Sequence, residues 1–246
     1  MTNRTTEIPM GVPMLLLPPS EGKAFDDPDS NDSGWDPSDG TFGALELQRL
    51  AVAEALSAAG GGSEKLLGVG GKHLLRAQAA NSMLIGAPTM PAWRRYTGVV
   101  WDHLDPASLG AVARRRIVVV SGLLGVVRAD DPIPDYRLRM SVNLAPMGKL
   151  STWWRDDVTA ALQRAAKGKV IVDMLPQEHR AAWTTENLPR GRRGVTVSLV
   201  DPTGKPGGHF AKAAKGELAR AILSDGIDVL ESWRHERFEL IVTPLT

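Results

Sequence analysis

The sequence predicts a single α/β domain, and three observations carry that prediction. A chain of 246 residues is long enough to bury one substantial hydrophobic core. Short apolar runs at 14–17, 117–120 and 170–172 are bounded by proline, glycine or charged residues, as buried strands are. Longer stretches at 44–59 and 152–166 repeat their apolar residues at helical spacing, which predicts amphipathic helices between the strands.

The composition narrows the class of protein. Hydrophobic residues make up 43% and charged residues 23% of the chain, which is ordinary for a globular domain. The net charge is only +1, so a nucleic-acid site must come from local clustering of cations. The absence of cysteine excludes thiol catalysis, disulfides and Cys-ligated metal, and it suits a reducing compartment. No apolar run approaches the roughly 20 residues that span a bilayer, and the start lacks a signal-peptide core, so we expect a cytoplasmic protein with no membrane partner.

The first predicted strand is followed at once by a turn that carries a lysine. Residues 1–13 are expected to form a flexible extension, and a single domain is expected over 14–246. The segment Pro18–Lys23 ends the strand with a Gly-Lys pair, but the glycine and hydroxyl spacing of a phosphate-binding P-loop is missing. Lys23 therefore either binds an anion or lies on a surface turn.

An acidic segment and a glycine-rich segment follow. Residues 26–40 are rich in Asp, Ser and Gly, which predicts a mobile loop, because the carboxylates lack the spacing of a calcium loop. Residues 63–84 read as a short helix, a Gly-Val-Gly-Gly turn and a second helix that starts with a lysine. This is the layout of a helix-hairpin-helix, in which turn amides and the second helix's N-terminus bind a DNA phosphate. A glycine-rich turn packed on the domain is an equally good interpretation.

The centre of the sequence places arginines and tyrosines around a buried strand. Tyr96 and Trp101 can stack on bases, although such residues more often belong to the core. The stretch 121–140 contains a glycine turn, Arg128, a proline turn and then an alternating apolar and basic segment that predicts a further strand. Three arginines near a glycine turn suit an anionic ligand, and a core hairpin with solvated arginines is the alternative.

The last third of the chain adds carboxylates and lysines. Asp173 closes a predicted strand, at the sheet edge where open α/β sheets bind ligands, and Glu178 follows. The two acids form a candidate acid/base pair, and helix capping explains them equally well. A hairpin is predicted from 195–200 and Phe210, then a helix over 217–224 and a strand over 238–242. Lys212 and Lys215 precede that helix as a second candidate anion site. The five histidines show no metal-binding spacing, so we predict no metal and no cofactor.

Seven collinear segments together are similar to a known family. They are LLLPPSEGKA, GVGGKHLLRAQAAN, RYTGVVWDHLD, SGLLGVVRADDPIPDYRLRM, LSTWWRDDVTAAL, VIVDMLPQEH and HFAKAAKGELARAIL, and they span most of residues 14–223. In this order they resemble the bacterial YaaA peroxide-stress proteins, in an actinobacterial-type branch. The glycine pair before Lys72 and the acidic loop depart from the common family pattern.

The resemblance implies a fold, a partner and a cellular role. The fold is a single α+β domain in which a twisted mixed sheet and surrounding helices enclose a basic cleft. The partner is DNA, bound without sequence specificity through the helix-hairpin-helix at Gly68, Gly70, Lys72, His73 and Arg76. The role is to limit DNA damage driven by free iron under peroxide. The implied cleft residues are Lys23, Lys72, Tyr96, Arg128, Tyr136, Arg137, Glu178, Lys212 and Lys215.

Two functions from different classes therefore remain. The first is a DNA-binding protein of the oxidative stress response, which the turn at 68–72 and the resemblance favour. The second is an enzyme that acts on a small phosphorylated or nucleobase-like substrate in the same cleft, with Asp173 and Glu178 as its catalytic residues. A structural module with neither activity is a third interpretation. The sequence leaves the oligomeric state open.

Overall fold

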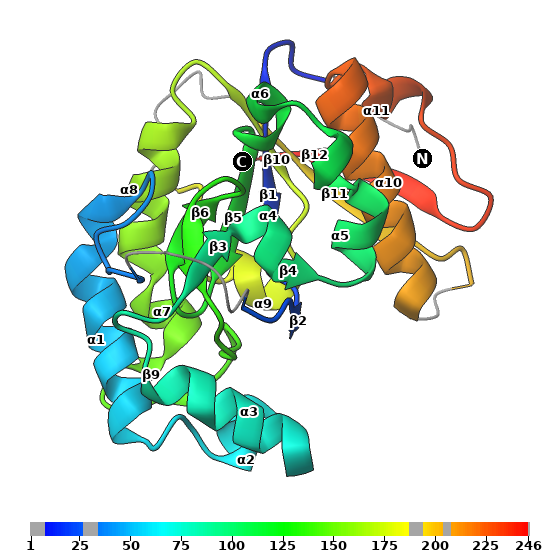
Figure 1. Ribbon diagram of the computed structural model, residues 1–246. Coiled ribbons are helices and arrows are strands. Elements are labelled where there is room, and N and C mark those ends of the chain that lie inside the picture. The colour runs from blue at the N-terminus through cyan, green and yellow to red at the C-terminus, as the bar shows by residue number, and fades with distance from the viewer. Residues whose placement is uncertain (1–7, 27–33, 187–193, 204–207, 246) are drawn as a thin grey trace.

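The structure is a computed structural model that describes residues 8–26, 34–186, 194–203 and 208–245 (Figure 1). Its centre is a six-stranded mixed sheet with the strand order β12-β11-β10-β1-β5-β6. The four inner strands run parallel, whereas β12 and β6 pair antiparallel at the two edges. The strands are β1 (Pro13–Leu17), β5 (Ile117–Ser121), β6 (Gly125–Arg128), β10 (Val170–Asp173), β11 (Gly194–Val200) and β12 (Glu239–Pro244).

Helices cover the sheet from both sides. In Figure 1, α1 and α8 lie to the left of the sheet, α5, α10 and α11 lie to its right, and α2 and α3 lie below it. The helices are η1 (Gly43–Leu45), α1 (Glu46–Ala58), α2 (Glu64–Leu67), α3 (Gly71–Ser82), α4 (Ala92–Arg95), α5 (Val99–Leu104), η2 (Pro106–Ser108), α6 (Ala111–Arg114), α7 (Leu150–Trp153), α8 (Arg155–Ala165), α9 (Gln177–Arg180), α10 (Gly208–Asp225) and α11 (Val229–Ser232). Short two-stranded ladders join β2 (Gly22–Lys23) to β4 (Tyr96–Thr97), β3 (Thr89–Pro91) to β7 (Pro132–Pro134), and β8 (Asn143–Leu144) to β9 (Gly148–Lys149).

The prediction of one mixed domain with a twisted sheet and surrounding helices is confirmed. The three apolar runs form β1, β5 and β10, and every residue of these strands is buried. Parallel strands covered on both faces read as unbroken apolar runs, which is why these three could be recognised. Across the described ranges, no helix is both long enough and apolar enough to cross a membrane.

Three predicted elements differ from the structure. Residues 136–140 alternate between buried and partly exposed, as predicted, but they form no strand. Instead of a neighbouring strand, the side chain of Asn81 pairs with the backbone N–H and carbonyl of Arg137. The predicted hairpin with Phe210 is wrong, because β11 pairs with β12 and Phe210 lies inside α10. The helix predicted over 217–224 begins already at Gly208, so Lys212 and Lys215 lie within it and do not precede it.

Two sequence predictions fall partly outside the described residues. The structure omits residues 1–7 of the extension predicted over 1–13 and residues 27–33 of the acidic loop predicted over 26–40. The structure does have the two helices and the glycine turn predicted for 63–84, as α2 and α3. Their action as a DNA-binding helix-hairpin-helix stays a prediction.

Candidate functional site

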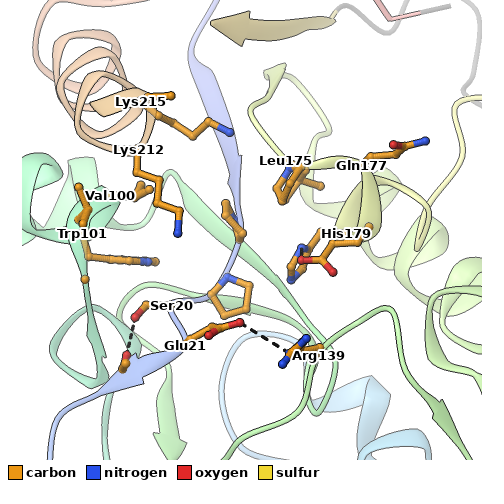
Figure 2. A pocket seen from close by; sticks show the side chains of 18 of the residues that line it. Ser20, Glu21, Val100, Trp101, Arg139, Leu175, Gln177, His179, Lys212 and Lys215 are labelled. Atoms are coloured by element: carbon orange, nitrogen blue, oxygen red, sulfur yellow. Dashed lines mark hydrogen bonds and ion pairs between the residues drawn. The ribbon is translucent and has the colours of Figure 1, made fainter. Parts of the chain in front are cut away.

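A cleft of about 640 Å³ opens beside the carboxyl ends of β1 and β10. Open α/β sheets bind their ligands at this edge. The chain segments that form it follow those two strands or come from β4, β11, α5, α9, α10 and the extended segment after β7 (Figure 2). Its lining contains residues 18–23, 97–101, 137–139, 175–180, 197–199, 211, 212 and 215.

The wall made by α5 and α10 carries two lysines and a tryptophan. Gly216 allows the two helices to approach closely, since a Cβ there would lie 2.4 Å from the carbonyl oxygen of Val100. This contact places Lys212 and Lys215 of α10 on the same side of the cleft as Trp101 of α5 (Figure 2). Lys215 Nζ donates a hydrogen bond to the Met174 carbonyl at 2.9 Å, and its burial lowers its pKa.

Trp101 is a buried donor without a partner. Its side chain is 3% exposed, it lines the cleft, and its Nε1 has no hydrogen-bond acceptor among the described residues. Buried indole N–H groups usually find an acceptor, because an unpaired one loses its hydration without compensation. A ligand in the cleft can supply that acceptor.

The opposite wall is α9 with the residues before it. Arg180 donates from Nε to Asp173 at 2.7 Å, and Asp173 also accepts from the backbone N–H of Leu175. Asp173 is fully buried, and its burial raises its pKa although Arg180 opposes the shift. Because Asp173 lies beneath the wall and does not line the cleft, its contacts are those of a residue that positions Arg180.

Glu178 and His179 of α9 have different surroundings. Glu178 is exposed and accepts a hydrogen bond from Ser141 Oγ at 2.9 Å. His179 is buried, and its Nδ1 lies 3.6 Å from Glu178 Oε1 without a hydrogen-bond partner. Burial lowers the pKa of His179 to about 4, so the imidazole is neutral at pH 7. The predicted acid/base pair of Asp173 and Glu178 is therefore split between a buried position and an exposed one.

Lys23 lines the floor of the cleft above two buried tyrosines, Tyr96 and Tyr136, which do not line it themselves. Lys23 lies in β2, which pairs with β4, so that it is the register partner of Tyr96. Its Nζ lies 4.2 Å from the ring centroid of Tyr136 and 5.6 Å from that of Tyr96. The two phenolic oxygens are 2.8 Å apart, and the Tyr136 oxygen is 2.7 Å from Ser121 Oγ. Both tyrosines are buried, as the core interpretation of Tyr96 expects.

Lys23 has an unusual ionisation. Burial lowers its pKa to about 7, and Arg137 and Arg95 lower it further, while Asp135 and Glu21 oppose them. A lysine amine in this state is about half neutral at physiological pH, and a neutral amine is a nucleophile or a base.

The third side of the cleft is the extended segment that carries Arg137 and Arg139. Glu21 bridges them, with its carboxylate oxygens 2.9 Å from Arg137 Nη2 and 3.7 Å from Arg139 Nε (Figure 2 draws the pair with Arg139). Arg139 Nη2 also donates to the carbonyl of Gly68 at 3.0 Å, and Arg137 Nε to that of Leu67 at 3.4 Å. The arginines therefore tie the end of α2 to the rim of the cleft.

The α2–α3 turn lies beside those arginines. Ser63 caps α2 by accepting from the backbone N–H of Leu66, and Gly68 ends it with φ +64°. Glycine is favoured at 68 because of this left-handed φ, and a Cβ there would also displace the guanidinium of Arg139. Beyond the partly buried Gly70, Lys72 and His73 are exposed in the first turn of α3.

Arg76 joins α3 to the floor of the cleft. Its Nη2 forms a 2.9 Å ion pair with Asp135 and donates to the carbonyl of Lys23 at 3.2 Å. Among the predicted DNA-contact residues, it is therefore the one already held by protein partners, whereas Lys72 and His73 remain available to solvent.

Arg128 lies away from the cleft. It is the register partner of Val118, near the start of β5, whereas the cleft lies at the other end of the parallel strands. Its guanidinium donates to the carbonyl of Arg115, and it lines a separate pocket of about 250 Å³. The sequence could not show this, because the antiparallel direction of β6 decides at which end of the sheet Arg128 lies.

The sequence gives no functional signal for two residues of the cleft, His179 and Arg180. Trp101 is predicted only as a base-stacking or core residue, and Arg139 only as one of three arginines that suit an anion. The tertiary structure alone brings the nitrogens of Trp101 and His179 to one cleft. The one signal in the sequence is that each of these residues lies within a few positions of a predicted site residue. Over the described ranges, no group of three or more histidines and carboxylates is arranged to hold a metal ion.

Comparison with known proteins identifies the family of this chain. The family model described as peroxide stress protein YaaA matches residues 14–239. A UPF0246 protein of Streptomyces coelicolor is 36% identical over 222 residues, which cover 87% of this chain and 84% of the relative. UPF0246 proteins of Corynebacterium glutamicum and Corynebacterium efficiens are 37% and 36% identical, over 72% and 85% of this chain and 69% and 84% of the relatives. The chain therefore belongs to the family of the peroxide stress protein YaaA.

Proposed function

We propose that this chain acts in the peroxide stress response by binding DNA across the cleft and the α2–α3 turn, and so limits damage to it. The proposal rests on the excess of positively charged side chains that line the cleft. Six lysines and arginines but only two glutamates are among the described residues that line the cleft, in a chain whose net charge is +1. The cations are Lys23, Arg137, Arg139, Arg180, Lys212 and Lys215. Such clustering is what a phosphate backbone requires, since its affinity comes from the release of counterions.

The α2–α3 turn supplies a second contact on the same side. Lys72 lies in the first turn of α3, where the backbone N–H groups have no partner within the helix. A helix N-terminus favours a phosphate through these amides and the helix dipole. Because Arg139 bonds to Gly68, the turn and the cleft are adjacent, so one DNA strand can contact both. Contacts of this kind position DNA without reading its sequence.

Fluorescence anisotropy with duplex, single-stranded and bulged DNA, titrated over salt, tests this function. Each phosphate contact contributes roughly 0.9 to the slope of log affinity against log salt for duplex DNA. Lys72→Gln and Lys212→Gln should each weaken binding and reduce the slope by about 1. Lys167→Gln is the control, because this exposed lysine precedes β10 at the opposite end of the strands. A DNA affinity that does not change with salt concentration would contradict the proposal. So would an equal loss of affinity in all three variants.

A small anionic substrate is a second candidate, and the unpartnered nitrogens of Trp101 and His179 favour it. The cleft volume of about 640 Å³ falls within the roughly 300–1,000 Å³ of small-molecule sites. If this candidate is correct, a nucleoside monophosphate should raise the thermal midpoint of the wild type in the absence of DNA. Lys212→Gln should remove that shift, and Glu178→Gln should abolish any turnover without unfolding the protein.

A further inference from the structure

One amine in the cleft differs from the other cations around it. Lys23 Nζ donates a hydrogen bond to the Ser20 carbonyl at 2.9 Å and lies on the face of Tyr136. None of the ion pairs within the described ranges includes it. Its contacts are therefore a carbonyl and aromatic surfaces, which hold the amine in place without neutralising its charge.

The carboxylates nearest to Lys23 are occupied by arginines. Glu21 pairs with Arg137 and Arg139, and Asp135 pairs with Arg76. Arg95 and the two tyrosines lie beneath the amine. Together with the carboxylates and arginines just named, they are the titratable and charged groups around it. Burial favours loss of the lysine proton and lowers its pKa to about 7, although Asp135 and Glu21 raise the pKa by more than Arg137 and Arg95 lower it.

Lys215 is the other desolvated amine of the cleft, since it donates to the Met174 carbonyl and burial lowers its pKa. Of the two lysines, Lys23 is the one that lies on aromatic rings within the described ranges. Lys212 is exposed to solvent, and the arginines carry guanidinium groups rather than amines. A desolvated lysine beside other cations is the arrangement that activates an amine toward carbonyl compounds.

We propose that Lys23 is a nucleophile that forms an imine with the aldehyde of an abasic deoxyribose in DNA. The inference rests on the DNA binding proposed above. The lone pair of Nζ attacks the aldehyde carbon, a proton moves from nitrogen to oxygen, and the carbinolamine then loses one water to leave the imine. The flanking phosphates of an abasic site suit the surrounding cations, among them Arg137 and Lys212, while the missing base leaves the aldehyde open to the floor of the cleft.

Reductive trapping with the full chain tests the proposal. The protein is incubated with a duplex that contains one abasic site, and borohydride delivers hydride to the imine carbon, which leaves a stable secondary amine. We expect a protein–DNA adduct whose peptide mass maps to Lys23. Lys23→Arg keeps the positive charge and should lose the adduct, whereas Lys167→Arg should retain it. The trapping rate should rise with pH and level off above about 7, because only the neutral amine reacts.

Further arms separate this inference from DNA binding itself. A duplex with a tetrahydrofuran in place of the abasic sugar has no aldehyde, so its anisotropy reports binding alone. Binding of that duplex without trapping of the abasic one overturns the inference and leaves the proposed function intact. An adduct that maps to Lys212 or Lys215 also overturns it. Trapping of free 2-deoxyribose 5-phosphate without DNA binding would refute both DNA as the source of the aldehyde and the proposed function. Because the wild-type adduct is mapped directly, a folding defect in Lys23→Arg cannot hide the result.

Discussion

Replacing Asn81 by alanine tests whether one buried amide holds the arginine segment of the cleft in place. Asn81 lies in α3 and is fully buried. Its Nδ2 donates to the carbonyls of Gly61 and Arg137, each at 2.8 Å, and its Oδ1 accepts from the backbone N–H of Arg137 at 2.9 Å. The side chain thus takes the place of a neighbouring strand and connects α3 to the segment that carries Arg137 and Arg139.

The expected magnitude follows from the groups that Asn81→Ala leaves without a partner. Three backbone groups lose their hydrogen bonds, and each buried group left unsatisfied costs about 1–3 kcal/mol. The free energy of unfolding should therefore fall by about 3–9 kcal/mol, a large part of the stability of a typical domain. Gln78→Ala is the matched control on the same helix. It removes a single hydrogen bond from a partly exposed side chain to the Gly62 carbonyl, which should cost about 0.5–1.5 kcal/mol.

Equilibrium unfolding in urea gives both values, with the slope checked for two-state behaviour. DNA affinity of the folded fraction should also fall in Asn81→Ala, because Arg137 and Arg139 lose their fixed backbone. A loss of stability no greater than that of Gln78→Ala would refute this reasoning. So would a large loss of stability with unchanged DNA affinity, which would mean that the arginine segment needs no anchor.

Three further predictions concern buried ionisable groups. Arg49→Met removes a buried guanidinium that donates to four backbone carbonyls, and the unfolding free energy in urea should fall by about 3 kcal/mol or more. His179 has its pKa lowered from 6.5 to about 4, so the unfolded state binds the proton first and stability should fall as pH drops from 6.5 to 4. Lys23 has its pKa lowered from 10.5 to about 7, so stability should rise with pH over that range, and Lys23→Met should be more stable than the wild type at pH 7.

The pH-dependent effects are read as differences between wild type and variant, because other groups titrate in the same ranges. His179→Gln should reduce the loss of stability between pH 6.5 and pH 4. An unchanged loss would show that this imidazole is not buried in its neutral form. Equal stability of Lys23→Met and wild type at pH 7 would show that the lysine is fully solvated. For Arg49, a variant as stable as the wild type would mean that the four carbonyls find other donors.

Local signals explain which parts of the fold could be predicted. The apolar runs of β1, β5 and β10 were recognisable because a strand buried on both faces has no polar positions. The ends of α2 were recognisable because Ser63 and Gly68 are a capping residue and a left-handed residue, whose preferences are set within a few positions. The placement of Lys23 after β1 likewise follows from the general position of ligand sites at strand ends.

The remaining features depend on contacts between distant segments. The alternation over 136–140 was read correctly, but its hydrogen-bond partner is Asn81, 56 residues away from Arg137 in sequence, and no periodic pattern encodes such a pairing. The helix α10 begins at Gly208, earlier than the predicted 217, because its first turns lie beyond the apolar stripe that marked the helix. Trp101 and His179 meet at one cleft only because α5 packs on α10 and α9 follows β10.

Several unsatisfied groups of the cleft are open to a ligand. Of the seven buried side-chain nitrogens and oxygens without a hydrogen-bond partner in the described ranges, three belong to cleft residues, Trp101, Arg139 and His179, and four lie elsewhere. Lys23 adds an amine whose proton is destabilised. By contrast, the buried guanidinium of Arg49 donates to four backbone carbonyls. Buried donors and a destabilised cation lower stability in the free protein. An anionic ligand with exposed oxygens would satisfy the Trp101 and Arg139 donors together, and DNA phosphates and a sugar aldehyde have that chemistry.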